Sequence, residues 1–510
     1  MHGFPVLAAV GLLIPSAHAL YETTYKSSSL AIQPFTIVSR SPTYDTDNTI
    51  LYMVCPDGVD VEQRGPVIYK SSGELVWADP SVGPCNDINL RTYNGEDYLT
   101  FWVGNGTPAA NEGHGSGKVV LMNSNYEIVM NVTAVSPTGA DVHEFNVVGP
   151  GNTSAVLTSY VPVPADLSSV GGLENGWYMD VLIQEVEIST GALLFNWSTL
   201  DHIPLNESYL VPTTQFEGSK EADPWDAVHV NSIDKDDDGN YLISGRHTQT
   251  LYKINPQGEI VWRLGGKRSD FTALDNESDF HWQHHAKWRT AGSQISLFDD
   301  AAALMAINDT LTVIVSEPVA SSKYLNVDQT AMTVSLDKKF LPSPSVSEVN
   351  LREAEGSVEP YGSNVLIGYG FNPWVQAADF KSTEVVFSAV IGPNNASLWH
   401  GGINNYRVFQ TSTLQFNGHP TRPPNVSVVG DDVYVSWNGA THVVSYDLLT
   451  GAHATRVSTK VTNVPKSGFE TKICAAGSEA FVSVAALAAN GTVLGTSAVY
   501  KKSDGSVAGQ

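Results

Sequence analysis

Residues 257–262 read Gln257-Gly258-Glu259-Ile260-Val261-Trp262, and this pattern of a turn glycine, aliphatic residues and an aromatic residue occurs twice more. The other copies are Ser72-Gly73-Glu74-Leu75-Val76-Trp77 and Thr190-Gly191-Ala192-Leu193-Leu194-Phe195. Each copy predicts a hairpin turn followed by an outer strand whose aromatic side chain packs between two sheets. Repeated four-stranded units that bury one another's faces favour a β-propeller. On this pattern alone, a large irregular β-sandwich is the alternative.

The chain around these repeats is also rich in short segments typical of strands. Apolar runs containing Val, Ile, Tyr and Trp are separated by Gly, Asn and Asp, and helical periodicity is nearly absent. Examples are residues 97–103, 118–122, 241–244, 311–315 and 384–390. We therefore predict an all-β fold.

The sequence divides into a large and a small β region. The stretch 418–424, Gly418-His419-Pro420-Thr421-Arg422-Pro423-Pro424, contains prolines that cannot join a sheet ladder and predicts a stiff connector. Residues 20–417 before it would form the propeller. Residues 425–501 after it contain alternating strands and a core-type Trp437, which predict a small fibronectin- or immunoglobulin-like β-sandwich. The polar residues 502–510 are expected to form a flexible tail.

The composition excludes several classes of protein. The 510 residues include 28 Lys and Arg against 53 Asp and Glu, which gives a net charge of −25 spread along the chain. Nucleic acids and anionic membrane surfaces need clustered basic residues, so neither is an expected partner. With 42% hydrophobic and 16% charged residues, the composition is that of a folded protein rather than a disordered one. We expect a monomer.

The N-terminus predicts export. Residues 1–19 contain an apolar run from Phe4 to Pro15 and the small-x-small sequence Ala17-His18-Ala19, as in a secretory signal peptide. No later segment approaches the roughly 20 apolar residues that a membrane helix needs, so no membrane span is expected. Ten N-x-Ser/Thr sequons predict N-glycosylation and a secreted or secretory-pathway lumenal protein. They are Asn105, Asn131, Asn152, Asn196, Asn206, Asn276, Asn308, Asn395, Asn425 and Asn490.

Three cysteines are present. Cys55 and Cys85 are close enough in sequence to pair in an oxidising compartment, and Cys474 would then be a buried thiol. Three unpaired core cysteines are the alternative. A thiol catalyst is not expected, because neither Cys55 nor Cys85 lies beside a histidine and Cys474 lies in an ordinary strand.

Residues that could carry chemistry concentrate between 223 and 300, at or near the ends of predicted strands. From such positions the inner strands of a propeller deliver side chains to its central channel. The candidates in this region are His229, Arg246, His247, Arg263, His281, Trp282, His284 and His285. The acidic run 234–240 in the same region resembles half of an EF-hand loop, but its twelfth position is Gly245 rather than Glu, and a hairpin turn is predicted instead.

Several runs in this region resemble the arylsulfotransferase family, in its fungal secreted branch. They are Asp226-x-x-His229-x-Asn231-Ser232, Asp234 to Ser244, Arg246-His247, Gly258 to Gly266, Phe280-x-Trp282-Gln283-His284 and Ile295 to Asp300. Upstream, Asp141-x-His143-Glu144-Phe145 resembles the family more loosely. The resemblance is specific over residues 223–300 and moderate over 21–415, and no motif in the C-terminal region contributes to it.

The resemblance implies a six-bladed propeller and an enzyme that needs no cofactor. Bacterial members of the family transfer a sulfuryl group between phenols through a covalent sulfohistidine, without the nucleotide sulfate donor PAPS. By motif position His284 would be the nucleophile, and His229, His247 and Arg263 would line the sulfate pocket. Arg246, His143, His281, His285 and Trp282 are the expected substrate-binding residues.

These residue types suit that chemistry. A neutral imidazole is a nucleophile at neutral pH, and imidazolium with a forked guanidinium would stabilise the charge on sulfuryl oxygens. Arg246 is the alternative to Arg263, but strand alternation would point it away from His247. His281, His284 and His285 are close enough to suggest a metal site as well, yet His284 and His285 would face opposite sides of a strand, and we predict no metal.

Three functions from different classes agree with such a channel. The first, which we predict, is a secreted transferase that moves sulfuryl groups between aromatic or phenolic small molecules. The second is a cyclase of the hetero-Diels–Alder type in fungal secondary metabolism, in which a His or Arg hydrogen bond polarises a carbonyl of a polyketide or terpenoid. The third is a non-catalytic secreted binding module. In the absence of any site, the histidines would only satisfy hydrogen bonds in a propeller core.

Overall fold

The computed structural model describes residues 22–106, 113–212, 218–290, 292–307, 310–344, 354–393 and 402–508. The expected signal peptide and the sequons at Asn308 and Asn395 lie outside these residues. Almost all regular structure is β, as predicted. The helical segments of the described part are α1 (Thr199–His202) and the 3₁₀ turns Pro80–Val82, Ser168–Val170, Leu205–Glu207 and Gly266–Arg268.

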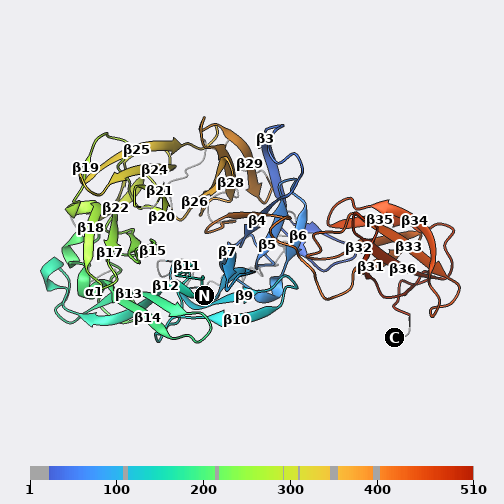
Figure 1. The fold of residues 1–510 in the computed structure, drawn as a ribbon. Helices are drawn as coiled ribbons and strands as arrows, with labels where there is room; N and C mark the ends of the chain where they lie inside the picture. The colour runs from blue at the N-terminus through green and yellow to red at the C-terminus, as the bar shows by residue number, and fades with distance from the viewer. Residues whose placement is uncertain are drawn as a thin grey trace, which may run out of the picture.

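Six antiparallel sheets of four or five strands follow one another around a ring in the described part of the chain. Figure 1 shows the ring face-on, with β7, β11, β15, β20 and β26 nearest its centre. Innermost strands of neighbouring sheets contact one another around the central channel. The fold is therefore the propeller that the repeated turn–strand units predict.

Within each blade, neighbouring strands follow one another from the channel to the outer edge. The first blade contains β30 (Phe409–Ser412), β4 (Ile50–Val54), β5 (Val67–Lys70) and β6 (Leu75–Ala78). The second contains β7 (Cys85–Tyr93), β8 (Glu96–Gly106), β9 (Gly115–Met122) and β10 (Ile128–Val132). The third contains β11 (Phe145–Val148), β12 (Ser154–Ala165), β13 (Gly176–Glu187) and β14 (Leu193–Ser198).

The second half of the ring repeats this order. The fourth blade contains β15 (Val230–Lys235), β16 (Tyr241–Gly245), β17 (Thr250–Ile254) and β18 (Ile260–Gly265). The fifth contains β20 (His284–Thr290), β21 (Gln294–Asp299), β24 (Ser321–Asp328), β25 (Thr333–Phe340) and β19 (Thr272–Ala273). The sixth contains β26 (Ser357–Tyr361), β27 (Asn364–Gly368), β28 (Trp374–Asp379), β29 (Val385–Ile391) and β3 (Phe35–Arg40). Two separate hairpins pair β1 (Thr23–Thr24) with β2 (Ala31–Ile32) and β22 (Ala302–Ile307) with β23 (Thr310–Val315).

Strands from both ends of the propeller region close the ring. Strand β3 from the N-terminal side pairs with β29 and completes the sixth blade. Strand β30 from the C-terminal side pairs with β4 and forms the inner edge of the first blade. Two blades are thus each assembled from segments far apart in sequence, so the ring cannot open without breaking a sheet.

The three repeated units lie where the sequence predicts them. Each turn glycine has a positive φ, which only glycine adopts without strain: +87° at Gly73, +70° at Gly191 and +89° at Gly258. The strands that follow, β6, β14 and β18, are the outermost strands of their blades. Trp77 and Trp262 are buried between blades, and Phe195 stacks on Tyr241 with ring centroids 4.3 Å apart. The acidic run also forms a hairpin turn, in which Asp236 accepts hydrogen bonds from Asn240.

Strands from Asn425 to Lys501 form two sheets beside the ring (Figure 1). One contains β31 (Asn425–Val429), β32 (Asp432–Ser436) and β35 (Glu470–Cys474). The other contains β34 (Thr459–Pro465), β33 (Ser445–Gly451), β36 (Phe481–Leu487) and β37 (Val493–Thr496), with β38 (Tyr500–Lys501) paired to β36. The expected flexible tail instead folds back through residue 508, where Ala508 N donates to Val499 O at 2.8 Å.

Cys55 and Cys85 pair as predicted, but Cys474 is not buried as predicted. Cys55 and Cys85 form a disulfide with Cα atoms 5.6 Å apart, beside the innermost strands of the first two blades. Cys474 is exposed, so the prediction of a buried thiol is wrong. The reason is strand alternation, because the neighbouring Ile473 takes the core-facing position of β35.

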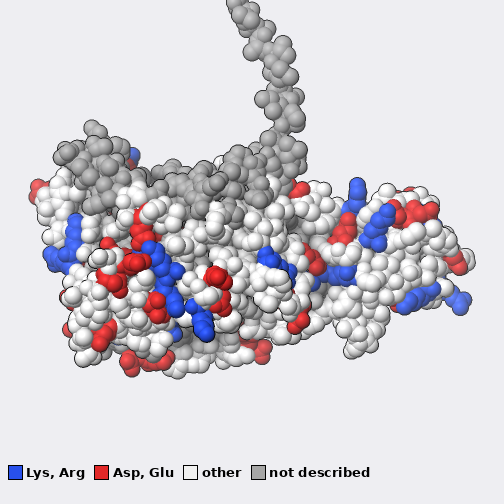
Figure 2. Space-filling view, turned by 90° about the horizontal axis from the view of Figure 1, so that it is seen from above, with Lys and Arg blue, Asp and Glu red and all other residues white. Residues whose placement is uncertain are grey.

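Charged side chains of both signs share the surface. Figure 2 shows Lys and Arg among Asp and Glu rather than gathered in one basic patch on the described part of this face. Every sequon asparagine within the described residues is exposed, as N-glycosylation would require. Every helix among the described residues is far too short to cross a membrane.

A buried ion-pair network joins the inner strands across the channel. Arg407, which lies just before β30, reaches Asp87 Oδ1 at 3.0 Å, Glu144 Oε2 at 3.4 Å and Asn231 O at 2.7 Å. Lys287 on β20 adds an ion pair to Glu144 at 2.8 Å. Burial alone would raise the pKa of Glu144, but the charges of Lys287 and Arg407 lower it to about 2. This network links five of the six blades.

Replacing Arg407 with Met should destabilise the propeller by about 3–5 kcal/mol, because Asp87 and Glu144 would lose a buried partner. The shift is measured as the change in free energy of unfolding for the propeller transition in urea. Arg456→Met, at an exposed position of the sandwich, is the matched control and should leave that transition unchanged. A loss below about 1 kcal/mol for Arg407→Met would contradict the role given to the network.

Candidate active site

Five histidine rings gather at one end of the channel, above the ion-pair network. Three of them come from segments next to the innermost strands: His143 precedes β11, His229 precedes β15 and His284 begins β20. His247 lies in the turn after β16, the second strand of the fourth blade. The fifth, His114, precedes β9 of the second blade. Neighbouring rings are close, with centroids 4.8 Å apart for His143 and His229 and 4.7 Å apart for His229 and His247.

Three of these histidines are each held by a buried aspartate. His143 Nδ1 lies 2.6 Å from Asp141 Oδ2, His229 Nδ1 lies 2.5 Å from Asp226 Oδ2, and His284 Nδ1 lies 2.7 Å from Asp300 Oδ2. An ionised carboxylate next to Nδ1 favours the tautomer with a proton on Nδ1 and a lone pair on Nε2. Among the described residues, the Nε2 atoms of these three histidines have no hydrogen-bond partner.

Asp226 is the centre of the cluster. Its Oδ2 accepts hydrogen bonds from His229 Nδ1 and also from His114 Nε2 at 3.0 Å. Its main-chain oxygen accepts one from His247 Nδ1 at 2.7 Å. Burial alone would raise the pKa of Asp226, but the surrounding histidines lower it well below its usual value. One aspartate therefore orients three imidazoles from two blades, two through its carboxylate and one through its main-chain oxygen.

Burial keeps three of the histidines neutral at neutral pH. It lowers the pKa of His229 well below the usual value and that of His247 to about 4. The pKa of His284 is also well below its usual value, because of burial and then the nearby positive charge of Arg246. Burial raises the pKa of Asp300, with further contributions from Asp299 and Glu355. His229, His247 and His284 are therefore neutral imidazoles beside one guanidinium.

Arg246 supplies that positive charge. Its Nη1 donates to His247 Nε2 at 3.2 Å, and its guanidinium lies 3.9 Å from the ring centroid of Trp282. Strand alternation was expected to point Arg246 away from His247, but β16 ends at Gly245 and both residues belong to the following turn. A side chain at Gly245 would lie 2.4 Å from Thr248 Oγ1, so the turn that presents this pair requires glycine.

Arg263 does not line the pocket as predicted. It lies on β18, the outermost strand of the fourth blade, and its Nε is 3.2 Å from both carboxylate oxygens of Glu207. The arginine expected among the histidines is therefore Arg246 rather than Arg263.

Of the remaining predicted residues, His281 and Trp282 lie near the histidine cluster, and His285 lies on the opposite face of β20. His281 lies at the rim, where its Nδ1 is 2.9 Å from Gln249 Oε1, and Trp282 is buried beside Arg246. His285 faces away from His284, accepting from Val358 N at 3.2 Å, and lines a polar cavity of about 240 Å³ together with Lys287 and Arg289. The structure therefore does not bring His285 to the histidine cluster, in line with the alternation expected for residues 284 and 285.

Backbone strain marks the same place. His229 and Trp282 have φ values of +54° and +53°, in the left-handed region that non-glycine residues rarely adopt. Such residues cost about 1–3 kcal/mol each and persist where the surroundings enforce them, as they often do at functional sites.

Buried donors without partners add to the site. Within the described residues, Arg246 Nε, Trp282 Nε1 and Gln249 Nε2 are buried and make no hydrogen bond. An unpaired buried donor costs about 1–3 kcal/mol, so a cluster of them points to a ligand with acceptor oxygens. These donors and the Nε2 lone pairs can serve both anion binding and nucleophilic attack.

Sequence reasoning missed the acidic partners and His114. Asp141, Asp226 and Asp300 occur in the quoted motifs, but their role as Nδ1 acceptors becomes visible only from the geometry. A signal existed, since an aspartate two or three residues before a histidine occurs at both His143 and His229. For His114 no such signal exists, because it meets Asp226 across 112 residues of sequence.

Among the described residues, His114, Asp226 and His229 form a group whose potential metal-ligand atoms all lie within 4.8 Å of one another. The 2.5 Å between Asp226 Oδ2 and His229 Nδ1 is a hydrogen-bond distance. Two ligands at about 2.0–2.2 Å from one tetrahedral ion would lie more than about 3 Å apart. As arranged, these atoms satisfy one another and do not form a metal site.

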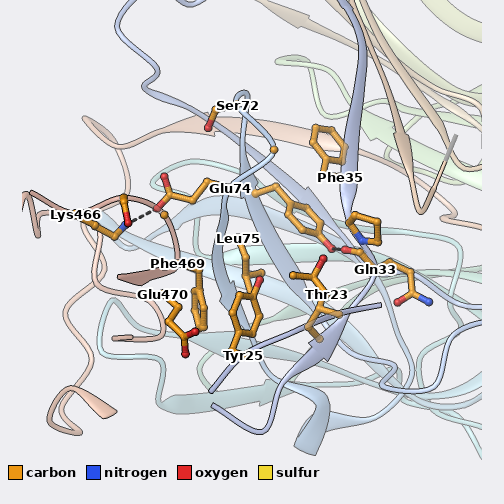
Figure 3. A pocket seen from close by; sticks show the side chains of 16 residues that line it. Thr23, Tyr25, Gln33, Phe35, Ser72, Glu74, Leu75, Lys466, Phe469 and Glu470 are labelled. Atoms are coloured by element: carbon orange, nitrogen blue, oxygen red, sulfur yellow. Dashed lines mark hydrogen bonds and ion pairs between the residues drawn. The ribbon is translucent and has the colours of Figure 1, made fainter. Parts of the chain in front are cut away.

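Two further cavities lie outside the cluster. One of about 180 Å³ adjoins it, with His114, Tyr160, Pro162 and Met179 in its wall. The other, of about 730 Å³, is an open cleft between the propeller and the sandwich. Figure 3 shows that its lining comes from the N-terminal segment 23–35, from the hairpin carrying Glu74 and from the loop carrying Lys466 and Phe469. None of these belongs to the histidine cluster.

The chain belongs to the arylsulfotransferase (ASST) family, whose model matches residues 90–392, more than half of its length. The match includes all five histidines of the cluster, Arg246 and the three aspartates. None of the curated proteins matches the chain.

Solved structures of distant sequence share parts of the architecture. A protein of unknown function from Bacteroides caccae is 11% identical, with a TM-score of 0.38 over 71% of this chain and 98% of that one. A functionally unknown protein from Desulfotomaculum acetoxidans is 12% identical, with a TM-score of 0.33 over 70% and 99%. The Dos1 propeller is 10% identical, with a TM-score of 0.30 over 76% and 73%. At these scores the likenesses carry no argument about function.

Inorganic sulfate should bind more tightly as the pH falls from about 8 to about 5. A bound anion favours imidazolium, so binding takes up protons at histidines whose pKa values burial has lowered. The affinity gain approaches but does not exceed about tenfold per pH unit for each proton taken up. Calorimetry in buffers of different ionisation enthalpy measures both the affinity and the proton uptake.

Two arginine variants provide the comparison for this titration. Arg246→Ala should abolish sulfate binding, whereas Arg263→Ala, which removes contacts with Glu207 and Tyr252 away from the cluster, should retain it. Binding that is independent of pH, or that needs Arg263 rather than Arg246, would contradict the assignment.

Proposed function

We propose that this chain transfers sulfuryl groups from aryl sulfate esters to phenolic acceptors, with His284 Nε2 as the nucleophile and without PAPS. Membership of the arylsulfotransferase family supports transferase chemistry in general. The observation that carries the specific proposal is the buried His284–Asp300 pair, 2.7 Å apart, beside the unsatisfied guanidinium of Arg246. In this arrangement His284 would act as a nucleophile beside a buried group that stabilises negative charge.

The first half-reaction needs a lone pair on Nε2. His284 Nε2 attacks the sulfur of the ester, an N–S bond forms, and the bond from sulfur to the aryl oxygen breaks, so that a phenolate leaves. The Nε–H of Arg246 and the indole N–H of Trp282, both buried and without a hydrogen-bond partner among the described residues, would receive the sulfuryl oxygens. Asp300 would stabilise the positive charge that develops on the imidazole, as the aspartate of a Ser-His-Asp triad does.

The second half-reaction needs a base. The acceptor phenol gives its proton to a neutral imidazole, its oxygen attacks the sulfur, and the N–S bond breaks to restore His284. His229 suits this role, because Asp226 holds its Nδ1 and its Nε2 has no partner among the described residues. A positive charge on His229 would lower the pKa of His284, so the two side chains lie near each other in the channel.

The protonation of the His284–Asp300 pair sets the pH dependence of the first step. The reactive form carries one proton, on Nδ1, with Asp300 ionised. Burial raises the pKa of Asp300, so at low pH the pair carries a second proton and Nε2 is blocked. The rate of the chemical step should therefore rise with pH, while anion binding weakens, and kcat/KM should pass through a maximum.

One observation also favours the cyclase alternative. The histidines are neutral and the donors Arg246 Nε and Trp282 Nε1 lack partners among the described residues, an arrangement that also suits the carbonyl of an uncharged polyketide or terpenoid. In that reaction a hydrogen bond would polarise the carbonyl and no covalent intermediate would form. The position of Asp300 behind His284 has no part in such a reaction, so we favour sulfuryl transfer.

Action outside the cytosol is part of the proposal. The Cys55–Cys85 disulfide and the exposure of every described sequon asparagine support an oxidising, glycosylating compartment.

Release of 4-nitrophenolate from 4-nitrophenyl sulfate in the presence of phenol tests the proposal. The native chain should show ping-pong kinetics that depend on both substrates. His284→Ala should remove turnover, and Asp300→Asn should lower kcat on the order of 10²- to 10⁴-fold, because the tautomer of His284 is no longer fixed.

The control is His453→Ala, an exposed histidine of the sandwich, which should leave the rate unchanged. A native chain that binds sulfate but releases no nitrophenolate would overturn the transferase proposal. If the same chain then accelerated a cycloaddition of a polyketide or terpenoid diene, the cyclase would take its place.

A further inference from the structure

The sandwich is attached to the propeller through Phe469, which packs on Tyr25 with ring centroids 4.6 Å apart, and through polar contacts. Lys466 Nζ pairs with Glu74 Oε1 at 2.5 Å, Glu470 accepts from Ser27, and Gly439 N donates to Val76 O at 2.9 Å. Asn438 exchanges two hydrogen bonds with the main chain of Ala78. Open clefts flank these contacts, including the large one in Figure 3, so part of the junction is not closed by protein.

A second cleft, of about 410 Å³, lies at the same junction and is lined by aromatic, proline and polar side chains. From the propeller come Trp77 and Tyr126, which stack with ring centroids 4.8 Å apart. From the sandwich comes Trp437, which is half-buried and rests on Gly495. Its indole N–H donates to Arg422 O of the connector at 2.6 Å, so the ring is held in place.

Asn425 belongs to the lining of this cleft and heads an N-x-Ser sequon. It is the first residue of β31, is exposed, and pairs in register with Ser436, the residue before Trp437. A group attached to its side chain would therefore begin inside the cleft.

We propose that an N-linked glycan on Asn425 occupies this cleft and fixes the sandwich to the propeller. The attachment transfers the oligosaccharide from a lipid-linked diphosphate donor: a bond forms between Asn425 Nδ2 and the first sugar carbon, the carbon–oxygen bond to the diphosphate breaks, and Nδ2 loses a proton. The first N-acetylglucosamine units would lie between Trp437 and the wall formed by the propeller.

The chemistry of the lining suits a sugar. One face of a pyranose ring presents C–H groups that pack on an aromatic ring, and its edge carries hydroxyl and amide groups. Trp437 supplies the aromatic surface, while Asp79, Asn125 and Arg422 supply hydrogen-bonding groups at the rim. Tethering raises the effective concentration of the sugar to the millimolar range, so contacts too weak to bind a free sugar suffice.

The test compares Asn425→Gln with Asn490→Gln in the full chain secreted from a eukaryotic host. Asn490 is also exposed, but it lies in the turn between β36 and β37 and lines none of the clefts described above. Glycopeptide mass spectrometry first establishes the occupancy of both sites. Hydrogen exchange of peptides covering residues 72–82 and 434–442 then reports the opening of the junction.

Loss of the Asn425 glycan should speed exchange at the junction several-fold and lower the melting temperature of the sandwich by about 4 °C or more. Loss of the Asn490 glycan should do neither. The proposal is overturned if Asn425 is unoccupied, or if the two variants behave alike. Enzymatic removal of glycans from the native chain separates the sugar from the substitution and should reproduce the Asn425→Gln result. None of these measurements depends on sulfuryl transfer, so their outcome is independent of the proposed function.

Discussion

The buried salt bridges of Arg407 hold the rest of the structure in place. Its guanidinium contacts Asp87 in the second blade, Glu144 just before the third blade and the main-chain oxygen of Asn231 in the fourth. These contacts lie next to β30, the strand that closes the ring. Buried charges are stable only when paired, so the inner strands must keep their register for the network to survive. That register in turn fixes where β11, β15 and β20 begin, and each of those starts carries a histidine of the cluster.

The two ends of the channel thus have different chemistry. One end is filled by paired cations and anions that satisfy one another, with His285 at its edge. At the other, three imidazoles are tied at Nδ1 to aspartates, and a guanidinium keeps an unused donor within the described structure. Within the described residues, the second end combines aspartate-held imidazoles with a guanidinium donor that has no partner, and sulfuryl transfer needs both a nucleophile and a cation.

Much of this arrangement could be predicted from local sequence. The turn glycines before Trp77 and Trp262 predicted the blades, and short sequence separation predicted the Cys55–Cys85 pair. His143, His229, His247 and His284 were recognised by motif and do gather in space. Arg246 was predicted only as the alternative to Arg263, because strand alternation was applied to a residue one position past the end of β16. His114 could not be found, since only the closure of the ring brings it to Asp226.

The net charge of −25 describes the exterior and not the site, where one guanidinium stands beside neutral imidazoles. The most direct test of the proposed site is a rapid-quench experiment with an aryl sulfate and no acceptor, followed by intact-mass and fragment-mass analysis. The account predicts one added SO₃ group per chain, localised to His284 and discharged when a phenol is added. An adduct on another residue, or released phenolate without any adduct, would contradict it.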